Sequence, residues 1–306
     1  MSDIIIVGGG CAGLTAAIYA ARSGRSVSVF ESNSFGGQIA SAPQVDNYPG
    51  IPHISGLKFS ESLFSQASDL GVDFYVDEVT GIKVDGNKKI ITTDSTSGFD
   101  THYCSAVIVA TGAKHRCLKI EKEYELLGHG VSYCATCDGA FYKDCDVAVI
   151  GGGDTAVTEA LLLSSICNKQ VYLIYRGTKF RANDYLLKEL YKKDNIIVKK
   201  ESNLTKLLGK DELTGITIKD SVCEQELPVK AVFIAIGHEP NSSTFSGLLE
   251  VDYSGYFVSG ENCCTRVPGI FVAGDCRTKK LRQLTTATSD GANAAMEACR
   301  YCSISE

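Results

Sequence analysis

Short apolar runs recur along the chain, and most of them end at a glycine or an acidic residue. The four clearest runs cover residues 4–7, 27–31, 147–150 and 171–175. Runs of four or five residues bounded in this way are typical of strands buried in a parallel sheet. A membrane-spanning helix, in contrast, needs about 20 apolar residues. Segments 14–23 and 156–163 lie between the paired runs and have helical composition. The pattern therefore predicts two strand–helix–strand units.

The rest of the pattern predicts further strands and two more helices. Residues 60–71 have amphipathic spacing, and the alanine-rich stretch 286–301 predicts a final helix. Short strands expected at 74–76, 81–84 and 89–93 resemble a β-meander. Further strands are predicted at 106–110, 196–200, 215–219, 232–236 and 270–273. Strands that alternate with helices in this way indicate an α/β fold.

A glycine-rich fingerprint follows the first predicted strand directly. Its sequence is Gly8-Gly9-Gly10-Cys11-Ala12-Gly13, and Glu31 ends the next strand 18 residues after Gly13. The glycines permit a tight turn and let backbone N–H groups approach a pyrophosphate at a helix N-terminus. Glu31 is placed to accept the hydroxyls of a ribose and would repel a 2′-phosphate. We therefore predict FAD or NAD here rather than NADP. The alternative, a glycine-rich turn without a ligand, wastes backbone entropy.

The second unit repeats the fingerprint but differs where its second strand ends. The fingerprint is Gly151-Gly152-Gly153-Asp154-Thr155-Ala156, so the chain contains a duplicated nucleotide-binding pattern. In place of an acid, the second strand ends in Tyr175 and a basic stretch. Arg176 and Arg181, with Lys179 between them, offer cations to a 2′-phosphate, which indicates NADP. The alternative is a solvated basic turn.

A dithiol motif lies between the two fingerprints. The stretch Cys134-Ala135-Thr136-Cys137-Asp138-Gly139 places two thiols three residues apart, with an acid directly after them. Such a pair can form a redox-active disulfide, and Asp138 can supply or accept the proton that a leaving thiolate needs. Cys299 and Cys302 form a second C-x-x-C, so a four-cysteine zinc site is the alternative. Because the two pairs are far apart in sequence, we favour the redox interpretation.

The other cysteines are numerous but do not suggest a secreted disulfide framework. The chain has 13 cysteines, an odd number, at irregular spacing, and its start lacks the pattern of a secretory signal. We expect reduced, buried thiols in a cytoplasmic protein. This expectation covers Cys104, Cys117, Cys145, Cys167, Cys223, Cys263, Cys264 and Cys276.

The overall charge excludes some classes of obligate partner. The net charge is −6, and the sequence pI is about 5.5. Nucleic acids and anionic membranes attract clustered lysine and arginine, so we expect neither to be a partner.

Together these motifs make the chain similar to the low-molecular-weight thioredoxin reductases, the class II flavin-dependent pyridine nucleotide-disulfide oxidoreductases. The stretches that carry the resemblance are 8–13, 36–38, Asn47, 110–112, 134–138, 151–156, 237–238, 274–275 and 282–283. The resemblance implies an α/β fold with two Rossmann-like dinucleotide-binding domains of the three-layer ββα sandwich type, the second inserted into the first. The FAD-binding domain would comprise residues 1–113 and 240–306. The NADPH-binding domain, which carries the dithiol, would comprise residues 114–239.

The resemblance also implies a reaction. NADPH would reduce FAD, FAD would reduce the disulfide, and the dithiol would reduce thioredoxin. Cys137 would be the thiol next to the flavin, Cys134 the thiol that attacks thioredoxin, and Asp138 the acid–base. The enzyme would be a homodimer whose domains rotate about hinges near residues 113–116 and 238–240.

The cofactor-binding residues that the resemblance implies form two groups. Those for FAD are Gly8, Gly10, Ala12, Gly13, Glu31, Gly37, Gln38, Asn47, Val79, Ala110, Thr111, Gly112, Gly274, Asp275, Arg282 and Gln283. Those for NADPH are Gly151, Gly153, Asp154, Thr155, Ala156, Arg176 and Arg181.

Two features depart from the family pattern. Tyr175-Arg176-Gly177 stands where the family usually has His-Arg-Arg, so one phosphate-binding arginine is missing. Relatives without that motif resemble enzymes that take electrons from reduced ferredoxin, which makes ferredoxin the second possible donor. Cys11 replaces a proline that is common in the first fingerprint. We expect it to serve in packing, and the alternative is an oxidation site close to the cofactor.

Two further functions are compatible with the motifs. One is a reductase of another small disulfide protein. The second is a non-enzymatic protein that is zinc-stapled or senses nucleotides.

Overall fold

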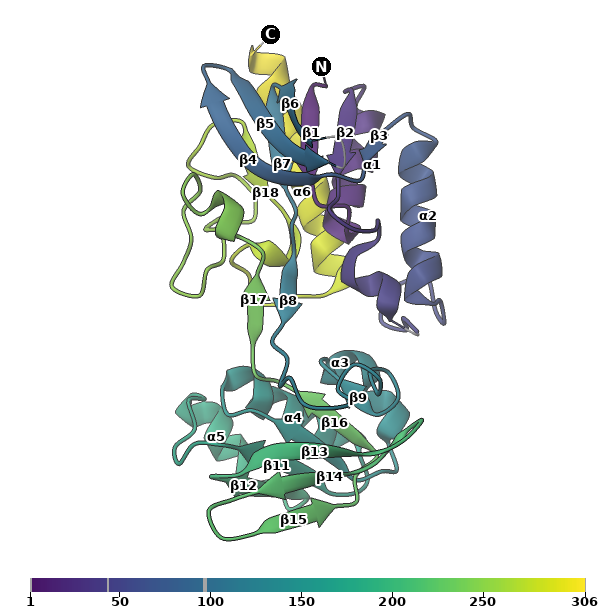
Figure 1. Ribbon diagram of the computed structural model, residues 1–306, viewed down its shortest axis with the longest axis vertical. Helices are drawn as coiled ribbons and strands as arrows, with labels where there is room; N and C mark the ends of the chain where they lie inside the picture. The colour runs from purple at the N-terminus through teal and green to yellow at the C-terminus, as the bar shows by residue number, and fades with distance from the viewer. Residues whose placement is uncertain (1, 43, 96–97, 306) are drawn as a thin grey trace. The chain divides into compact units, whose positions relative to one another are not determined.

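The computed structural model describes residues 2–42, 44–95 and 98–305. The chain forms two compact units (Figure 1). The first comprises Met1–Lys114 and Glu239–Glu306, and the second comprises His115–His238. The second unit is therefore inserted into the sequence of the first.

The core of the first unit is a five-stranded parallel sheet. Its strands lie in the order β18 (Ile270–Val272), β7 (Ala106–Val109), β1 (Ile4–Val7), β2 (Val27–Phe30) and β3 (Asp73–Tyr75). Successive residues of a strand point to opposite faces of its sheet. In β1, Ile4 and Ile6 belong to one apolar core, whereas Ile5 and Val7 belong to another. Burial on both faces explains why these strands are continuous apolar runs in the sequence.

Helices cover one face of this sheet, and an antiparallel sheet covers the other (Figure 1). The core that contains Ile4 and Ile6 is completed by α1 (Cys11–Arg22), α2 (Gly56–Ser68) and α6 (Leu284–Ser305). The core that contains Ile5 and Val7 is closed by β4 (Glu78–Asp85), β5 (Lys88–Ser95) and β6 (Gly98–Cys104). The first unit is thus a three-layer ββα sandwich.

The second unit repeats this arrangement. Its parallel sheet has the order β12 (Ile196–Lys200), β11 (Val171–Tyr175), β10 (Val147–Ile150), β16 (Ala231–Ile234) and β9 (Val131–Ser132). Val147 and Val149 face α4 (Asp154–Ile166) and α5 (Asp184–Leu190). On the other face, Ala148 and Ile150 contact the antiparallel sheet of β13 (Asn203–Gly209), β14 (Leu213–Lys219) and β15 (Glu224–Leu227). The predicted fold class is confirmed.

The pairing predicted for one strand was wrong. The expected β-meander began at residues 74–76, but this stretch belongs to β3 and pairs in parallel with β2. The third strand of the meander is β6, whose residues are mostly exposed and polar. A strand that is largely solvated lacks the apolar run that marks buried strands, so the sequence did not reveal it.

The helices also differ from prediction, mainly at their ends. Helix α2 begins at Gly56 rather than residue 60, because the Ser55 hydroxyl caps it by accepting the N–H of Lys58 at 3.3 Å. The short helix α5 was not predicted, although Asn183 caps it by accepting the N–H of Leu186 at 3.0 Å. Of the eight cysteines expected to be buried, four are buried, namely Cys104, Cys167, Cys263 and Cys276. Cys117, Cys145 and Cys264 are only half-buried, and Cys223 is exposed because it lies in the turn before β15.

Short elements complete the chain. Strands β8 (Ala113–His115) and β17 (His238–Pro240) form a two-stranded sheet where the chain passes between the units. The remaining helix and 3-10 turns are α3 (Ala135–Asp138), η1 (Gly37–Ser41), η2 (Gly139–Tyr142), η3 (Ser243–Phe245) and η4 (Gly274–Cys276). Among the helices of the described residues, none has the length and apolar content to span a bilayer.

Candidate redox and nucleotide sites

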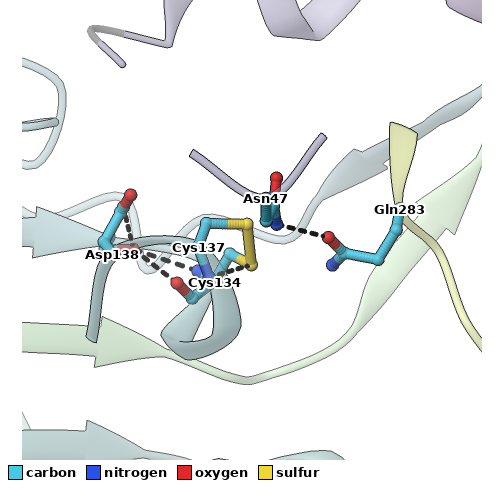
Figure 2. Close-up of a disulfide and its surroundings, with 6 residues drawn as sticks. Asn47, Cys134, Cys137, Asp138 and Gln283 are labelled. Carbon is cyan, nitrogen blue, oxygen red and sulfur yellow. Dashed lines mark hydrogen bonds between the residues drawn. A yellow bond between two sulfur atoms is a disulfide. The ribbon is translucent and has the colours of Figure 1, made fainter. Parts of the chain in front are cut away.

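The dithiol lies at the start of α3, directly after β9. Cys134 and Cys137 form a disulfide (Figure 2). Cys134 is the N-cap residue of α3, and its sulfur accepts the backbone N–H of Cys137 at 3.2 Å. Cys137 is exposed and Cys134 is half-buried. Strand β9 is fixed by its parallel pairing with β16, so the disulfide follows directly from the edge of a rigid sheet.

Asp138 is held beside the disulfide by a buried serine. The Ser132 hydroxyl donates to Asp138 Oδ2 at 2.7 Å and accepts the backbone N–H of Cys134 at 3.0 Å. Burial raises the pKa of Asp138, and the hydrogen bond from Ser132 opposes this rise. A carboxyl with a raised pKa keeps its proton to higher pH, which suits a proton donor. Ser132 was not predicted, because a serine two residues before a cysteine is not a recognisable signal.

Glu159 is a second carboxyl near the dithiol that was not predicted. It lies on α4 and accepts the backbone N–H of Ala135, the residue after Cys134. Burial raises its pKa to about 7, and that hydrogen bond opposes the rise. Its Oε2 atom is buried and, within the described residues, has no hydrogen-bond partner. No motif marks such a residue, since only the packing of α4 against α3 brings it to this place.

Tyr133, which precedes the first redox cysteine, is also fixed. Its hydroxyl donates to Glu123 Oε1 at 2.8 Å. The Glu123 carboxylate is buried and accepts the backbone N–H groups of Leu118 and Lys119 at 2.9 and 2.7 Å. His115 stacks on the Tyr133 ring with their centroids 4.9 Å apart, and burial lowers the pKa of His115 to about 4. The redox segment is therefore anchored on both sides.

The first fingerprint joins β1 to α1. A Cβ on Gly8 would overlap the Ala110 carbonyl, and a Cβ on Gly13 would overlap the Gly8 carbonyl. A Cβ on Gly10 would meet only the Cα of Gly37, at a distance of 3.8 Å, which is ordinary van der Waals contact. No side chain caps α1, so its N-terminus is left to a ligand. Ala12 is buried where this helix packs on the sheet.

Glu31 contacts the fingerprint directly. Its Oε2 atom accepts the backbone N–H of Gly9 at 2.8 Å, and its Oε1 atom accepts that of Asn33 at 3.1 Å. The acid is thus held at the end of β2, with one edge beside the loop where a pyrophosphate would bind.

The predicted FAD residues outside the fingerprint line the same unit in several groups. Gly37 packs on Gly10, and the Gln38 amide donates to the Ala113 carbonyl. Asn47 donates to Gln283 Oε1 at 2.9 Å (Figure 2). Hence the structure places Gly37 against the fingerprint and joins Asn47 to Gln283, which is far away in the sequence.

The remaining members of that set lie at or near strand ends. Thr111 lies between Ala110 and Gly112 after β7, and its hydroxyl donates to the Asn241 carbonyl at 2.6 Å. The side chain of Val79 packs in the core, so only its backbone is available to a ligand.

The loop after β18 carries charged candidates. Gly274 leads into Asp275, whose buried Oδ1 atom has no hydrogen-bond partner within the described residues and lies 3.8 Å from Lys279 Nζ. Burial raises the pKa of Asp275, and the charges of Lys279 and Arg282 oppose the rise. The Arg282 guanidinium lies 3.9 Å from the centroid of the Tyr256 ring. A buried oxygen that has an ion-pair partner but no hydrogen-bond donor fits a polar ligand group.

The second fingerprint has the same form but different surroundings. A Cβ on Gly151 would overlap the Ala235 carbonyl, whereas Gly153 faces open space. Asp154 begins α4 and accepts the backbone N–H of Asn183 at 2.8 Å, while Thr155 is exposed and Ala156 is buried against Gly151.

The end of β11 replaces the acid of the first unit with an aromatic ring. A Cβ on Gly152 would overlap the Tyr175 ring, so this ring covers the fingerprint loop. Phe180 stacks on Tyr175 with their centroids 5.2 Å apart. Arg176 and Arg181 are exposed, and the backbone N–H of Arg181 donates to the Gly152 carbonyl at 2.8 Å.

The second C-x-x-C does not share the environment of the first. Cys299 and Cys302 are buried on α6 in the helix-side core of the first unit. In the part of the chain that the structure describes, no cluster of three or more His, Cys, Asp or Glu side chains is arranged to hold a metal ion.

Comparisons with known proteins agree with these features. Residues 2–291 match the model of the family described as pyridine nucleotide-disulphide oxidoreductase. A thioredoxin reductase of Treponema pallidum is 41% identical over 305 residues, which cover 98% of this chain and 96% of that protein. A bifunctional thioredoxin reductase/thioredoxin of Mycobacterium leprae is 38% identical over 304 residues, 98% of this chain and 65% of that protein. The crystal structure of a Streptococcus pyogenes thioredoxin reductase superposes with a TM-score of 0.93 at 35% identity, covering 99% of both chains.

Proposed function

This chain belongs to the pyridine nucleotide-disulphide oxidoreductase family and, within it, to the low-molecular-weight thioredoxin reductases, and on that premise we propose that it is a thioredoxin-disulfide reductase. Electrons pass from NADPH through FAD to the Cys134–Cys137 disulfide and from there to thioredoxin. The observation that carries the proposal is this disulfide at the start of α3, in a chain with two dinucleotide fingerprints. The Mycobacterium leprae relative, named for both activities, supports thioredoxin as the partner.

The first unit would hold FAD. The uncapped N-terminus of α1 and the glycine-rich loop before it suit a pyrophosphate, and Glu31 suits a ribose. The Oδ1 atom of Asp275, which lacks a hydrogen-bond donor within the described residues, suits a hydroxyl donor of the cofactor. FAD, when bound, would accept a hydride from NADPH and return two electrons to the disulfide.

The second unit would hold NADPH and carry the dithiol. Gly153 is open toward a pyrophosphate, and Arg176 and Arg181 offer charge to a 2′-phosphate. We assign FAD to residues 1–113 and 240–306 and NADPH to residues 114–239. The paired strands β8 and β17 would be the hinge. Reduced ferredoxin is not favoured as the donor, because the close relatives carry thioredoxin reductase names.

The reduced dithiol would act by thiol–disulfide exchange. The Cys134 thiolate attacks one sulfur of the thioredoxin disulfide, which forms a mixed disulfide and releases a thioredoxin thiolate. The Cys137 thiolate then attacks the Cys134 sulfur, so the enzyme disulfide forms again and the second thioredoxin thiolate leaves. Asp138 supplies a proton to a leaving thiolate, for which its raised pKa is suited.

We also propose a reducing, cytoplasmic setting and a homodimer. The free thiols support the setting, since cytosolic reductants keep such thiols reduced. Light scattering during gel filtration tests the dimer, which a mass near 33 kDa would contradict, because one chain has a mass of 32.8 kDa.

The direct test is a coupled assay with purified components. The flavin-loaded protein, NADPH and a chromogenic aromatic disulfide are mixed with and without thioredoxin. We expect rapid reduction of the chromogen only when thioredoxin is present, and none from the Cys134→Ser variant. Reduction with a glutaredoxin-like protein but not with thioredoxin would assign another disulfide partner. Failure with every disulfide protein, despite bound flavin, would overturn the proposal.

A further inference from the structure

The carboxyl edge of the second-unit sheet carries one more cation than its sequence motif suggests. Lys200 ends β12 and is the register partner of Tyr175, which ends the neighbouring strand β11. Its side chain is exposed, as are those of Arg176, Lys179 and Arg181 in the following turn. Across the described ranges, no carboxylate lies within ion-pair distance of any of these four side chains. These four cations therefore have no ion-pair partner in the described ranges, and Glu201, which follows Lys200, is the acidic residue next to them in the chain.

The Lys200 side chain is directed by the aromatic residues that cover the fingerprint. Its Nζ atom lies 5.2 Å from the centroid of the Phe180 ring, which itself stacks on Tyr175 at an interplanar angle of 15°. The Tyr175 ring in turn fills the space above Gly152 and Gly177, where a Cβ on either glycine would overlap it. Lys200 thus lies on the same aromatic group that touches the fingerprint loop. A cation over an aromatic face is held there with modest strength.

Backbone hydrogen bonds join these parts. The N–H of Ser202 donates to the Tyr175 carbonyl at 3.2 Å, and the N–H of Glu201 donates to the Gly177 carbonyl at 3.3 Å. The N–H of Arg181 donates to the Gly152 carbonyl at 2.8 Å. The end of β12, the turn after β11 and the fingerprint loop are therefore fixed to one another. The backbone that carries Lys200 is consequently held in a fixed place relative to any nucleotide bound on the fingerprint.

We propose that Lys200 binds the ribose 2′-phosphate of NADPH together with Arg176 and Arg181, and so contributes to the choice of NADPH over NADH. This inference rests on the proposed function, since it takes the second unit as the NADPH site. A 2′-phosphate is a dianion with several acceptor oxygens, and a site with three cations can both neutralise it and bond to it. The alternative is that Lys200 binds no phosphate: its carbon chain covers Phe180 and its ammonium group is solvated.

The neighbouring lysine provides a matched control. Side chains alternate along a strand, so Lys199 and Lys200 point to opposite faces of the sheet. Lys199 Nζ donates to Gln225 Oε1 of β15 at 3.4 Å, on the face covered by the antiparallel sheet. Substituting either lysine by methionine removes one positive charge from the same strand. Only Lys200→Met removes it from the edge beside Arg176 and Arg181.

The test is calorimetric titration of the flavin-loaded protein with 2′,5′-ADP and, separately, with 5′-ADP, which lacks the 2′-phosphate. We expect Lys200→Met to raise the Kd for 2′,5′-ADP about five- to tenfold, as loss of a charge-assisted contact would. Lys199→Met should change that Kd less than about twofold, and neither variant should change the Kd for 5′-ADP. The salt dependence of 2′,5′-ADP binding should also be weaker in Lys200→Met than in the parent. Lys200→Arg keeps the positive charge and should therefore show the salt dependence of the parent.

The possible failures separate the two proposals. Equal effects of Lys199→Met and Lys200→Met would overturn the role of Lys200 and leave the NADPH site standing. If the parent protein binds 2′,5′-ADP and 5′-ADP with equal affinity, the second unit does not recognise the 2′-phosphate, and both NADPH and the role of Lys200 are wrong. If it binds neither, while the flavin is reduced by ferredoxin, the pyridine-nucleotide part of the proposed function fails with it.

Discussion

The two halves of this chain show how one fold is given two electrostatic characters. In both units, the residue at the end of the second strand contacts the middle glycine of the fingerprint. In the first unit that residue is Glu31, whose carboxylate accepts the N–H of Gly9 at 2.8 Å. In the second unit it is Tyr175, whose ring covers Gly152. The backbone arrangement is the same, so this side chain gives the first unit an acidic group beside the loop and the second unit an uncharged aromatic ring.

The two C-x-x-C pairs also differ in their surroundings. Cys134 and Cys137 follow a strand edge in the second unit, where Ser132 and Glu159 hold the surrounding backbone and Asp138. Cys299 and Cys302 lie one helical turn apart in the core of the first unit. Spacing alone therefore does not make a redox centre, because exposure and a nearby proton donor are also needed.

The largest expected effect comes from breaking the difference between the two cysteine pairs. Cys137→Ser should abolish NADPH-dependent reduction of thioredoxin, by at least about 10³-fold, because the remaining thiol cannot close a disulfide. Cys299→Ser is the matched control and should retain activity within about twofold. Turnover in the coupled thioredoxin assay measures both. Comparable losses in the two variants would mean that the buried pair takes part in the relay.

The next effect concerns the cations of the second unit. Arg181→Met should raise the Kd for NADPH about 10- to 100-fold, as expected for one or more charge-assisted hydrogen bonds. The Kd for NADH should change much less, because NADH has no 2′-phosphate. Fluorescence titration of the protein with each nucleotide gives both values. A parallel loss for NADH and NADPH would place Arg181 outside the 2′-phosphate site.

The acid of the first unit should matter for the flavin only. Glu31→Ala removes the acceptor of the Gly9 N–H and a partner for the ribose hydroxyls. We expect FAD to bind about tenfold more weakly, with 2′,5′-ADP binding unchanged. The flavin retained during dialysis, measured by absorbance, reports the first effect. Unchanged flavin retention would show that Glu31 serves the loop rather than the cofactor.

The last predicted effect is on stability rather than on cofactor binding or turnover, and it depends on pH. Glu159 has an ordinary pKa of 4.5 that burial raises to about 7 in the folded protein. Between these values the unfolded chain releases the proton while the folded chain keeps it, so stability falls as pH rises. The loss is complete above about pH 7 and amounts to about 3 kcal/mol.

Glu159→Gln tests this loss because glutamine stays neutral and can still accept the Ala135 N–H. The variant should match the parent in Tm near pH 4.5 and exceed it by roughly 5 °C at pH 8. A Tm difference that does not grow with pH would contradict the raised pKa of Glu159.

Much of the fold followed from local patterns. The buried strands β1 and β10 are unbroken apolar runs, and each is followed by a recognisable glycine-rich fingerprint, whose first glycine the structure shows to be sterically required. The exposed strand β6 and the capped helix α5 lacked an apolar run of this kind and were not predicted. Burial on both sides leaves a strong signal in sequence, whereas a solvated edge does not.

The candidate sites divide in a similar way. The dithiol and Asp138 form a contiguous motif, so their positions could be predicted. Ser132 is adjacent to the motif but forms no recognisable pattern with it. Glu159 and Lys200 lie on other elements, and only helix packing and strand register bring them to the dithiol and to the turn after β11. Residues that reach a site through tertiary contacts leave no spacing in the sequence by which to find them.

The central claim is that electrons pass from NADPH, through a flavin, to the dithiol of the second unit. The most direct measurement is an anaerobic titration of the flavin spectrum with NADPH, NADH and reduced ferredoxin in turn. We predict complete bleaching by about two equivalents of NADPH, because the flavin and the disulfide each take two electrons, and by about one equivalent in Cys137→Ser. NADH should need a much higher concentration. A flavin that is bleached only by reduced ferredoxin, or by the same amount of NADPH in the parent and in Cys137→Ser, would contradict the account.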